Sequence, residues 1–305
     1  MNDTVKSHLA LFGANLAYGA NYVVAKGLMP DPIGPNGFIF FRVSGAALLF
    51  WLLYLLFFYE PIKRNDFVRL AICGLFGVAC NQLLFFNGLM LTSPVNAPVI
   101  MTTTPILVLI LSAVILKQKV LTLQWVGVVI GAVGSVMLTL LNSEQSFATG
   151  IGDVFIFLNA ISYSFYLILV KPLMETYRPI TVISWVFLFG LVYVSIWPYT
   201  LPEAMAVDWG KFDFDKTWRF LFVVVGVTFV PYLLNIFSMK KLSAYIAAVY
   251  IYTQPILATF FIYVFYLLGK EDYTGDFNWT KVVSSLLIFG GVYLVIRPPK
   301  PKAGT

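Results

Sequence analysis

The sequence is poor in charge, histidine and cysteine, and each shortage excludes a class of protein. Only 11 % of the 305 residues are charged, 60 % are hydrophobic, and the mean hydropathy is +0.86. A soluble globular chain needs far more polar surface, so we expect this chain to lie in a lipid bilayer. Cys73 and Cys80 lie about 10 Å apart along one helix, which is too far for a disulfide, and no further ligands accompany them as a zinc site would require.

The motifs of membrane enzymes are also missing. The chain has one histidine, no HExxH, no GxSxG and no paired aspartates within its apolar runs. The net charge of +6 comes from basic residues in short loops, where they orient a membrane protein and do not form a face for nucleic acid. We therefore expect no enzymatic activity, no cofactor, no metal and no nucleic-acid partner.

What the chain does have is an internal duplication. The segment Leu16–Met29, LAYGANYVVAKGLM, recurs at Ile161–Met174 as ISYSFYLILVKPLM. Each copy opens a run of five apolar segments, and an odd number of crossings inserts the second copy upside down relative to the first. Inverted repeats of this kind are typical of secondary transporters. We predict one repeat over residues 1–145 and a second over residues 146–305.

Apolar runs of membrane-spanning length fix the expected fold class. About 20 apolar residues cross a bilayer core as a helix. On that length ten helices are predicted at 8–28, 36–58, 67–90, 94–117, 120–141, 151–173, 179–201, 217–240, 244–268 and 279–297. The fold is therefore predicted to be an all-α integral membrane protein with ten transmembrane helices in two inverted five-helix repeats.

The distribution of basic residues predicts the orientation. With the N-terminus in the cytoplasm, thirteen of the twenty Lys and Arg residues face the cytoplasm, six face the other side, and Arg42 lies within the second span. This bias favours cytoplasmic termini and a multi-pass protein of the cytoplasmic membrane.

The duplication extends to the fourth and ninth spans. The segment around Pro105 matches the segment around Pro255 at a constant offset of 150, which also pairs Ser93 with Ser243 and Ala97 with Ala247. Two other features are specific: Phe41-Arg42 early in the second span, and Leu268-Gly269-Lys270-Glu271 after the ninth. The equivalent place in the first half, Leu116 to Lys119, has no glutamate.

With these features the chain resembles an EamA-type member of the drug/metabolite transporter superfamily over essentially its whole length. The resemblance implies a central cavity, alternating access and the transport of small organic metabolites such as amino acids, often outward. It leaves the substrate open, because the superfamily also contains nucleotide-sugar and sugar-phosphate exchangers.

Polar side chains in a bilayer are costly unless they face protein or a wet cavity, so their spacing indicates the inward face. Asn15, Tyr18, Tyr22 and Lys26 form one stripe, and Asn159, Tyr163 and Tyr166 form another on the matching helix. The stripes predict a shared solute cavity; helix–helix contacts or interfacial aromatic residues would also explain them. The predicted solute-binding residues are Asn15, Tyr18, Tyr22, Asn81, Gln82, Asn159, Tyr163, Tyr166, Asn235 and Gln254.

Proline and glycine mark two further features. Pro105 and Pro255 are expected inside helices, where each frees a carbonyl four residues back and serves as a hinge for rocking or as a merely tolerated kink. Gly127, Gly131 and Gly134 form a small-residue face on the fifth span that suits close packing, either within the scaffold or across the seam of a homodimer.

Charge constrains the mechanism. No Asp or Glu falls within a predicted span, so proton coupling is disfavoured and facilitated diffusion or exchange is expected. Arg42 and Lys26 are candidate contacts for a carboxylate or phosphate. Against that function, Lys26 is close enough to its helix end to reach water, and a carbonyl or amide partner is favoured for Arg42.

Together these features predict a secondary transporter that exports or equilibrates amino-acid-like or aromatic solutes by alternating access. The alternative is an exchanger of sugar phosphates or nucleotide sugars, which needs at least two basic residues in the cavity. A membrane-embedded enzyme is the remote alternative.

Overall fold

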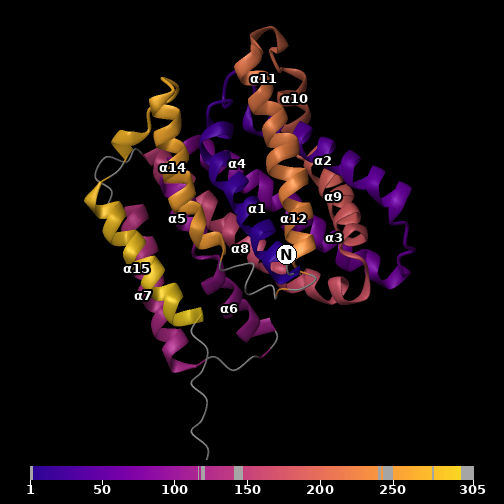
Figure 1. The fold of residues 1–305 in the computed structure, drawn as a ribbon, viewed down its shortest axis with the longest axis horizontal. Coiled ribbons are helices and arrows are strands. Elements are labelled where there is room, and N and C mark those ends of the chain that lie inside the picture. Colours follow the sequence, from indigo (N-terminus) through magenta and orange to yellow (C-terminus); the bar gives the residue numbers. More distant parts are fainter. Residues whose placement is uncertain are drawn as a thin grey trace, which may run out of the picture.

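The computed structural model describes residues 3–115, 117, 121–140, 147–239, 242, 250–276 and 278–296, and within them all regular structure is helical. The predicted repeat boundary at 145 and 146 and the paired residues Ser243 and Ala247 lie outside these ranges. Figure 1 shows the helices gathered into one elongated bundle.

The first half contributes five hydrophobic segments. Two are single helices, the third and fourth are composite, and the fifth is again single. In chain order they are α1 (Asp3–Lys26); α2 (Pro35–Phe57); η1 (Arg64–Asp66) with α3 (Phe67–Gly74), the π-helical η2 (Leu75–Ala79) and α4 (Cys80–Leu91); α5 (Asn96–Met101) with α6 (Thr104–Ile115); and α7 (Thr122–Leu140).

The second half repeats this order, with two added loop helices after its second segment. The elements are α8 (Phe147–Thr176); α9 (Pro179–Ile196); the loop helices α10 (Thr200–Met205) and η3 (Trp209–Lys211); α11 (Phe214–Leu221) with the π-helical η4 (Phe222–Phe229) and α12 (Val230–Met239); η5 (Tyr250–Thr253) with α14 (Gln254–Leu267); η6 (Thr274–Asp276); and α15 (Trp279–Ile296).

The hydrophobic segments suit a bilayer. Seven of the described helical segments are long and apolar enough to span a membrane, and α7 and α15 are shorter apolar helices. With α1, these make ten, five in each half, so the predicted all-helical membrane fold is confirmed. Large apolar side chains cover the outside, including Leu56, Ile256 and Leu267 at 69 %, 69 % and 79 % exposure, as a surface that faces lipid requires.

The seventh span ends earlier than predicted. We expected a helix over 179–201, but α9 ends at Ile196, and Trp197 adopts an extended conformation with ψ of 128°. The cause is Pro198, because a residue before proline is pushed out of the helical region. The sixth span differs in the other direction, since α8 continues through Pro172 to Thr176.

The α-helix of the fourth and ninth spans is interrupted where a kink was predicted. In the fourth span the turn residues Thr102 and Thr103 separate α5 from α6, and in the ninth span the 3-10 helix η5 passes directly into α14; we call both places breaks of the α-helix. Pro105 is the second residue of α6 and Pro255 the second residue of α14. A proline fits the first turn of a helix because its missing N–H would have no partner there. The Thr104 hydroxyl donates to the Met101 carbonyl at 2.7 Å, which satisfies the carbonyl that the break frees. A hinge motion at these breaks stays a prediction.

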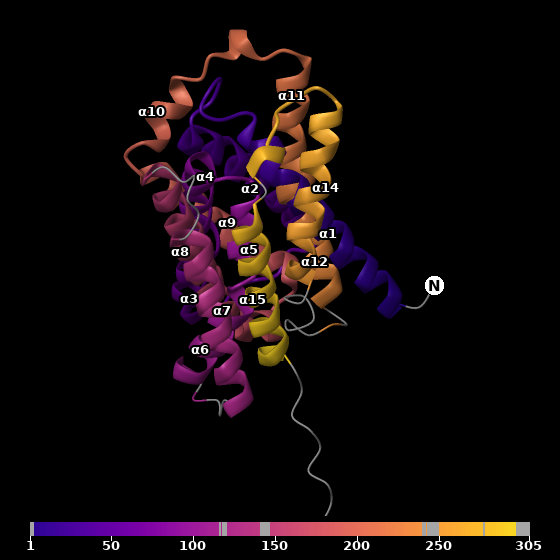
Figure 2. The same cartoon turned by 90° about the vertical axis from the view of Figure 1, so that its left-hand side faces the viewer.

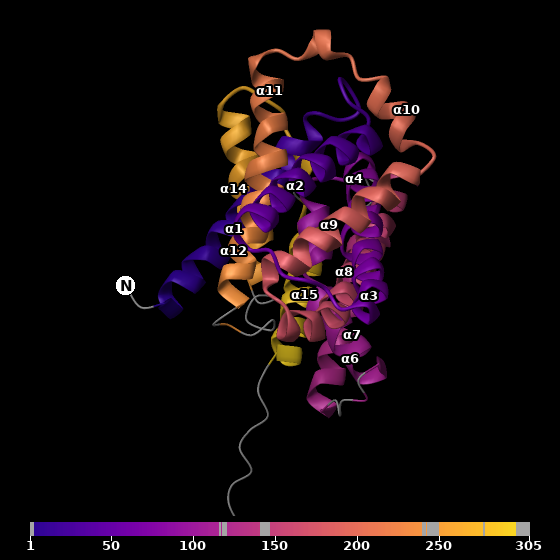
Figure 3. The ribbon, with the colours of Figure 1, turned by 90° about the vertical axis from the view of Figure 1, so that its right-hand side faces the viewer.

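The two halves interleave. α1 packs against α12 and α14 of the second half, while α8 packs against α4 and α6 of the first. α2 pairs with α9, and α7 pairs with α15, so equivalent helices meet across the duplication. Figures 2 and 3 show these pairs from two sides, with α10 and α11 at one end of the bundle and α6 at the other. We call the first of these the α10 end.

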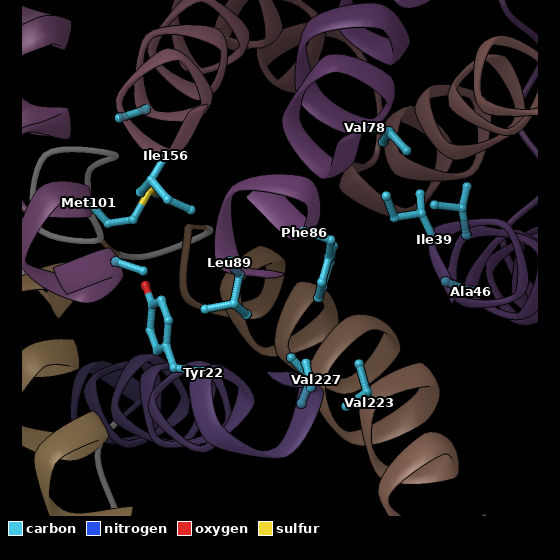
Figure 4. Packing of buried hydrophobic residues seen from close by; sticks show 14 of the residues in the cluster. Tyr22, Ile39, Ala46, Val78, Phe86, Leu89, Met101, Ile156, Val223 and Val227 are labelled. Carbon is cyan, nitrogen blue, oxygen red and sulfur yellow. The ribbon is translucent and has the colours of Figure 1, made fainter. Parts of the chain in front are cut away.

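Apolar side chains from both halves fill the interior. Phe86 of α4, Val78 of η2 and Val227 of η4 are fully buried, and Figure 4 shows them with Tyr22 and Leu89 in the same packed region. This apolar core packs together the helices that carry the polar site described below.

The glycine face of α7 is covered by α15. A side-chain carbon at Gly291 would lie 2.5 Å from the Gly127 carbonyl oxygen and 2.5 Å from the Gly131 backbone nitrogen. The predicted close packing therefore occurs within the chain, and this face is not available as a seam between two copies. A homodimer through another surface stays a prediction.

Replacing Gly291 by Ala should destabilise the protein. The added carbon would meet backbone atoms that cannot rotate away, and overpacking of this kind costs roughly 1–3 kcal/mol. Gly290→Ala is the matched control, since no atom lies within 4 Å of the position of its added carbon. Thermal unfolding in detergent micelles should show a lower Tm for Gly291→Ala alone; an equal response of both variants would contradict the tight contact.

Candidate solute cavity

A cavity of about 140 Å³ lies where α1, α2, α4, α8 and α12 meet the breaks before α6 and α14. This is well above the space that a single water molecule needs. Its described lining consists of Asn15, Tyr18, Asn21, Tyr22, Arg42, Asn81, Gln82, Phe85, Met101, Asn159, Tyr163, Leu167, Tyr232, Asn235, Ile251 and Gln254. Nine of the ten predicted solute-binding residues are among them, so the structure brings both polar stripes to one place.

The lining follows the duplication. Many of its residues form pairs between the two halves. The offset is 145 residues between α1 and α8, and 150 residues between the third and fourth spans and the eighth and ninth spans. The pairs are Tyr18 with Tyr163, Tyr22 with Leu167, Gln82 with Tyr232, Phe85 with Asn235, and Met101 with Ile251. The cavity therefore lies at the interface between the two repeats. Secondary transporters built from inverted repeats bind their substrates at this kind of interface.

One group of hydrogen bonds ties α1 to α14. The Tyr22 hydroxyl donates to Gln254 Oε1 at 2.8 Å, and Gln254 Nε2 donates to Asn15 Oδ1 at 2.9 Å. Asn15 Nδ2 in turn donates to the Leu11 carbonyl at 2.8 Å. Because each side chain is held on both sides, this wall of the cavity is rigid.

Two further bonds cross between the halves. Asn159 Nδ2 of α8 donates to the Asn81 carbonyl at 2.7 Å, and Asn235 Nδ2 of α12 donates to the Tyr18 hydroxyl at 3.2 Å. Both amides therefore have a fixed orientation. Some of the predicted residues thus also connect helices, as the alternative interpretation of the stripes expected.

Arg42 is the one ionised side chain in the described lining. It is 4 % exposed, its Nε donates to the Thr228 hydroxyl of η4, and its guanidinium carbon lies 4.7 Å from the centre of the Phe86 ring. From the sequence we expected a carbonyl or an amide as the partner of Arg42; in the structure its partners are the Thr228 hydroxyl and the Phe86 ring. Arg42 Nη1 is buried and has no hydrogen-bond partner among the described residues.

Three amide oxygens of the wall also lack a donor. Asn21 Oδ1, Gln82 Oε1 and Asn159 Oδ1 are buried, and the described part of the chain supplies no hydrogen bond to them. Unsatisfied buried polar atoms are rare in folded proteins and are usually explained by water or a ligand. Residues of the cavity wall therefore hold hydrogen-bonding capacity, at these oxygens and at Arg42, that the described part of the chain leaves unused.

Two predicted residues lie outside the cavity. Tyr166 is buried against Gly77, where an added carbon would lie 2.4 Å from its ring, and against Tyr163 at 5.9 Å between ring centres. The Lys26 ammonium donates to the carbonyls of Leu89 and Thr92 at the end of α4. Lys26 thus satisfies a helix end and does not reach the cavity.

Six lining residues were not predicted. Asn21 and Tyr232 carried a usable signal, since Asn21 lies three residues after Tyr18 and Tyr232 lies 150 residues after Gln82. Phe85, Met101, Leu167 and Ile251 are apolar, and polar patterning cannot identify them.

Carboxylates gather at the ends of the bundle. At the α10 end Glu203 accepts from Asn36 Nδ2 at 2.6 Å, and Asp153 accepts from Asn96 Nδ2 at 3.2 Å. At the opposite end the Tyr177 hydroxyl donates to Asp66 Oδ2 at 2.6 Å. Each of these hydrogen bonds joins the first half to the second. We call the bonds at each end of the bundle a latch; the cavity, with Arg42 in its wall, lies between the two latches.

Comparisons with known proteins agree with this architecture. An uncharacterized transporter of Archaeoglobus fulgidus is 26 % identical over 238 residues, which cover 78 % of this chain and 80 % of the relative. A WAT1-related protein of Arabidopsis thaliana is 21 % identical and covers 94 % of this chain and 84 % of its own length. A solved structure described as "Crystal structure of protein" has the same fold, with a TM-score of 0.61, 16 % identity and coverage of 95 % and 96 %.

The family match extends over both halves. The profile described as "EamA-like transporter family" matches residues 5–140 and again residues 150–297. The chain therefore belongs to the EamA-like transporter family, and the protein is a multi-pass membrane transporter of the drug/metabolite type.

Proposed function

We propose that the protein carries small organic metabolites, amino-acid-like or aromatic, through this cavity by alternating access. The observation that carries the proposal is the polar and aromatic cavity at the repeat interface, with buried hydrogen-bonding atoms left unused. The rings of Tyr18, Phe85, Tyr163 and Tyr232 supply flat apolar surface, and unsatisfied amides supply directional contacts. A solute of one ring with a polar group matches both kinds of surface.

Alternating access would use the latches at the two ends in turn. The breaks at Pro105 and Pro255 lie beside Met101 and Ile251 of the lining, so bending there would change the cavity directly. We assign the α10 end to the outside and both termini to the cytoplasm, because the basic residues favour that orientation. The membrane is then the cytoplasmic membrane.

The energy source is proposed to be the gradient of the solute itself. The described lining holds amides, phenols, apolar groups and Arg42. The carboxylates Glu203 and Asp66 lie away from it, at the two ends of the bundle. A proton relay usually uses a carboxylate or histidine within the pathway. Facilitated diffusion or exchange of solutes fits this lining best.

Exchange of sugar phosphates is the second candidate. It requires at least two basic side chains around a phosphate that carries up to two charges, and the described lining has Arg42 alone. Lys26, the other candidate, is bound to backbone carbonyls outside the cavity. The geometry therefore favours a singly charged or neutral solute.

Counterflow in proteoliposomes tests the proposal. Vesicles loaded with phenylalanine, tryptophan, phenylacetate or phenylacetamide should take up the same labelled solute faster than unloaded vesicles, for at least one member of the panel. Carriers show this trans-acceleration because a loaded site returns faster than an empty one, whereas a receptor or enzyme does not. Lys171→Gln, exposed at the end of α8, should behave like the wild type. Uptake that never saturates and never responds to internal solute would contradict the proposal.

A further inference from the structure

We propose that the cavity selects aromatic monocarboxylates over the corresponding amino acids, with the Arg42 guanidinium as the carboxylate contact. This inference rests on the proposed transport function and narrows its solute class. It follows from three observations: the charge of the lining, the contacts that hold the Arg42 guanidinium in place, and the aromatic rings and amide oxygens of the other lining residues.

The first step is the charge of the site. Arg42 is 4 % exposed and lies among neutral groups, because its contacts are the Thr228 hydroxyl and the Phe86 ring. Ion pairs such as Lys211 with Asp31 and Arg219 with Glu271 lie at the α10 end, and Arg42 forms no ion pair with another described residue. A buried charge is unfavourable unless an opposite charge or water accompanies it. A bound monocarboxylate would bring the charge of the site to zero.

The second step is the position of the guanidinium. Nε is bound to Thr228 and the flat face rests on Phe86, so the side chain has little freedom to leave the cavity wall. Nη1 is left unpartnered among the described residues, and Arg42 lines the cavity. A carboxylate oxygen is the strongest acceptor for such an N–H. The structure thus fixes one guanidinium in the cavity wall and leaves part of its hydrogen-bonding capacity unused, which suits one carboxylate.

The third step concerns the remainder of the solute. Tyr18 and Tyr232 line the same cavity as Arg42. Their rings can pack against an aromatic ring attached to the carboxylate. The unused oxygens of Asn159 and Gln82 suit a neutral N–H or O–H on that ring.

An ammonium group fits this lining less well. It would add a second positive charge beside Arg42, and the described lining offers it amide oxygens and rings but no carboxylate. An α-amino acid would therefore leave one positive charge in the site, whereas its analogue without the amine would leave none. Discrimination between phenylacetate and phenylalanine measures this difference.

The test compares phenylacetate, phenylalanine and neutral phenylacetamide by counterflow in wild type, Arg42→Gln, Arg42→Lys and the control Lys171→Gln. We expect half-saturation by phenylacetate at a concentration at least tenfold lower than by phenylalanine or phenylacetamide. Arg42→Gln should lose the preference for phenylacetate over phenylacetamide while still carrying phenylacetamide. Arg42→Lys should keep the preference for the anion because it keeps the charge.

Several outcomes would overturn the inference. Equal half-saturation by phenylacetate and phenylacetamide in the wild type would do so without any variant, even if Arg42→Gln failed to fold. A preference for phenylalanine would refute the monocarboxylate class and leave the transport function intact. Absence of trans-acceleration by these three solutes would overturn the monocarboxylate inference, and absence of it by tryptophan as well would overturn both proposals. An unchanged preference in folded Arg42→Gln would assign Arg42 to the scaffold.

Discussion

Replacing Glu271 by Gln is expected to lower the free energy of unfolding by about 2 kcal/mol, because the buried Arg219 guanidinium loses one of its two carboxylate partners. Arg219 of α11 has a side chain that is 2 % exposed, and its Nη1 lies 2.7 Å from Glu271 Oε1. The same guanidinium contacts Asp215 at 2.8 Å and the Phe265 ring at 5.0 Å. Asp215 would remain as one carboxylate, so the loss is large but folding is not abolished.

Lys270→Gln is the matched control in the adjacent position. Lys270 lies 2.8 Å from Asp215, but its side chain is 40 % exposed, and exposed ion pairs contribute about 0–1 kcal/mol. Chemical unfolding in detergent micelles, followed by tryptophan fluorescence, should separate the two variants clearly. If Glu271→Gln and Lys270→Gln lowered the free energy of unfolding equally, the burial of Arg219 would add nothing to the stability that its ion pair provides.

This ion pair gives the Leu268–Glu271 motif a structural role. α14 ends at Leu267, and Gly269 adopts a φ of +65°, which favours glycine over other residues. The turn places Glu271 against Arg219, and Gly27, directly after α1, leaves the space for them, since an added carbon there would lie 2.2 Å from Arg219 Nη1. The motif was recognisable in the sequence, but its partner on α11 was not.

The periodicity of polar residues predicted most of the cavity. Asn15, Tyr18 and Tyr22 lie on one face of α1, and all three line the cavity; their contact with a solute stays a prediction. On α8 the predicted face was slightly rotated. The cavity uses Tyr163 and Leu167, whereas Tyr166 turns into the room that Gly77 leaves on the neighbouring helix. Spacing within one helix cannot reveal a gap on another.

Two local departures from α-helix also lay beyond sequence patterns. The third and eighth spans contain the π-helical segments Leu75–Ala79 and Phe222–Phe229. The second of these carries Thr228, whose hydroxyl donates to the Val223 carbonyl five residues back and accepts from Arg42 Nε. A pattern with a period of 3.6 residues assumes regular helix, so it could not place Thr228 beside Arg42.

Uptake of phenylacetate into proteoliposomes is expected to follow the membrane potential, with about a tenfold change in accumulation for each 59 mV. The reason is charge conservation. If a monocarboxylate crosses alone, one negative charge moves with each solute, because Arg42 stays in the protein and the described lining supplies no second ion. A potassium diffusion potential, positive inside, should therefore drive accumulation, and a negative one should oppose it.

Phenylacetamide is the matched control, because it is neutral and its final distribution should ignore the potential. Protein-free vesicles measure the leak of the undissociated acid. An electroneutral exchanger would accumulate label only against internal anion and would not respond to the potential. A proton symporter would respond to a pH gradient and ignore the potential. Either result would contradict carriage of the anion alone. The second would mean that the proton crosses on the carboxyl group of the solute itself, because the described lining holds amides and phenols but no carboxylate or histidine to carry it at neutral pH.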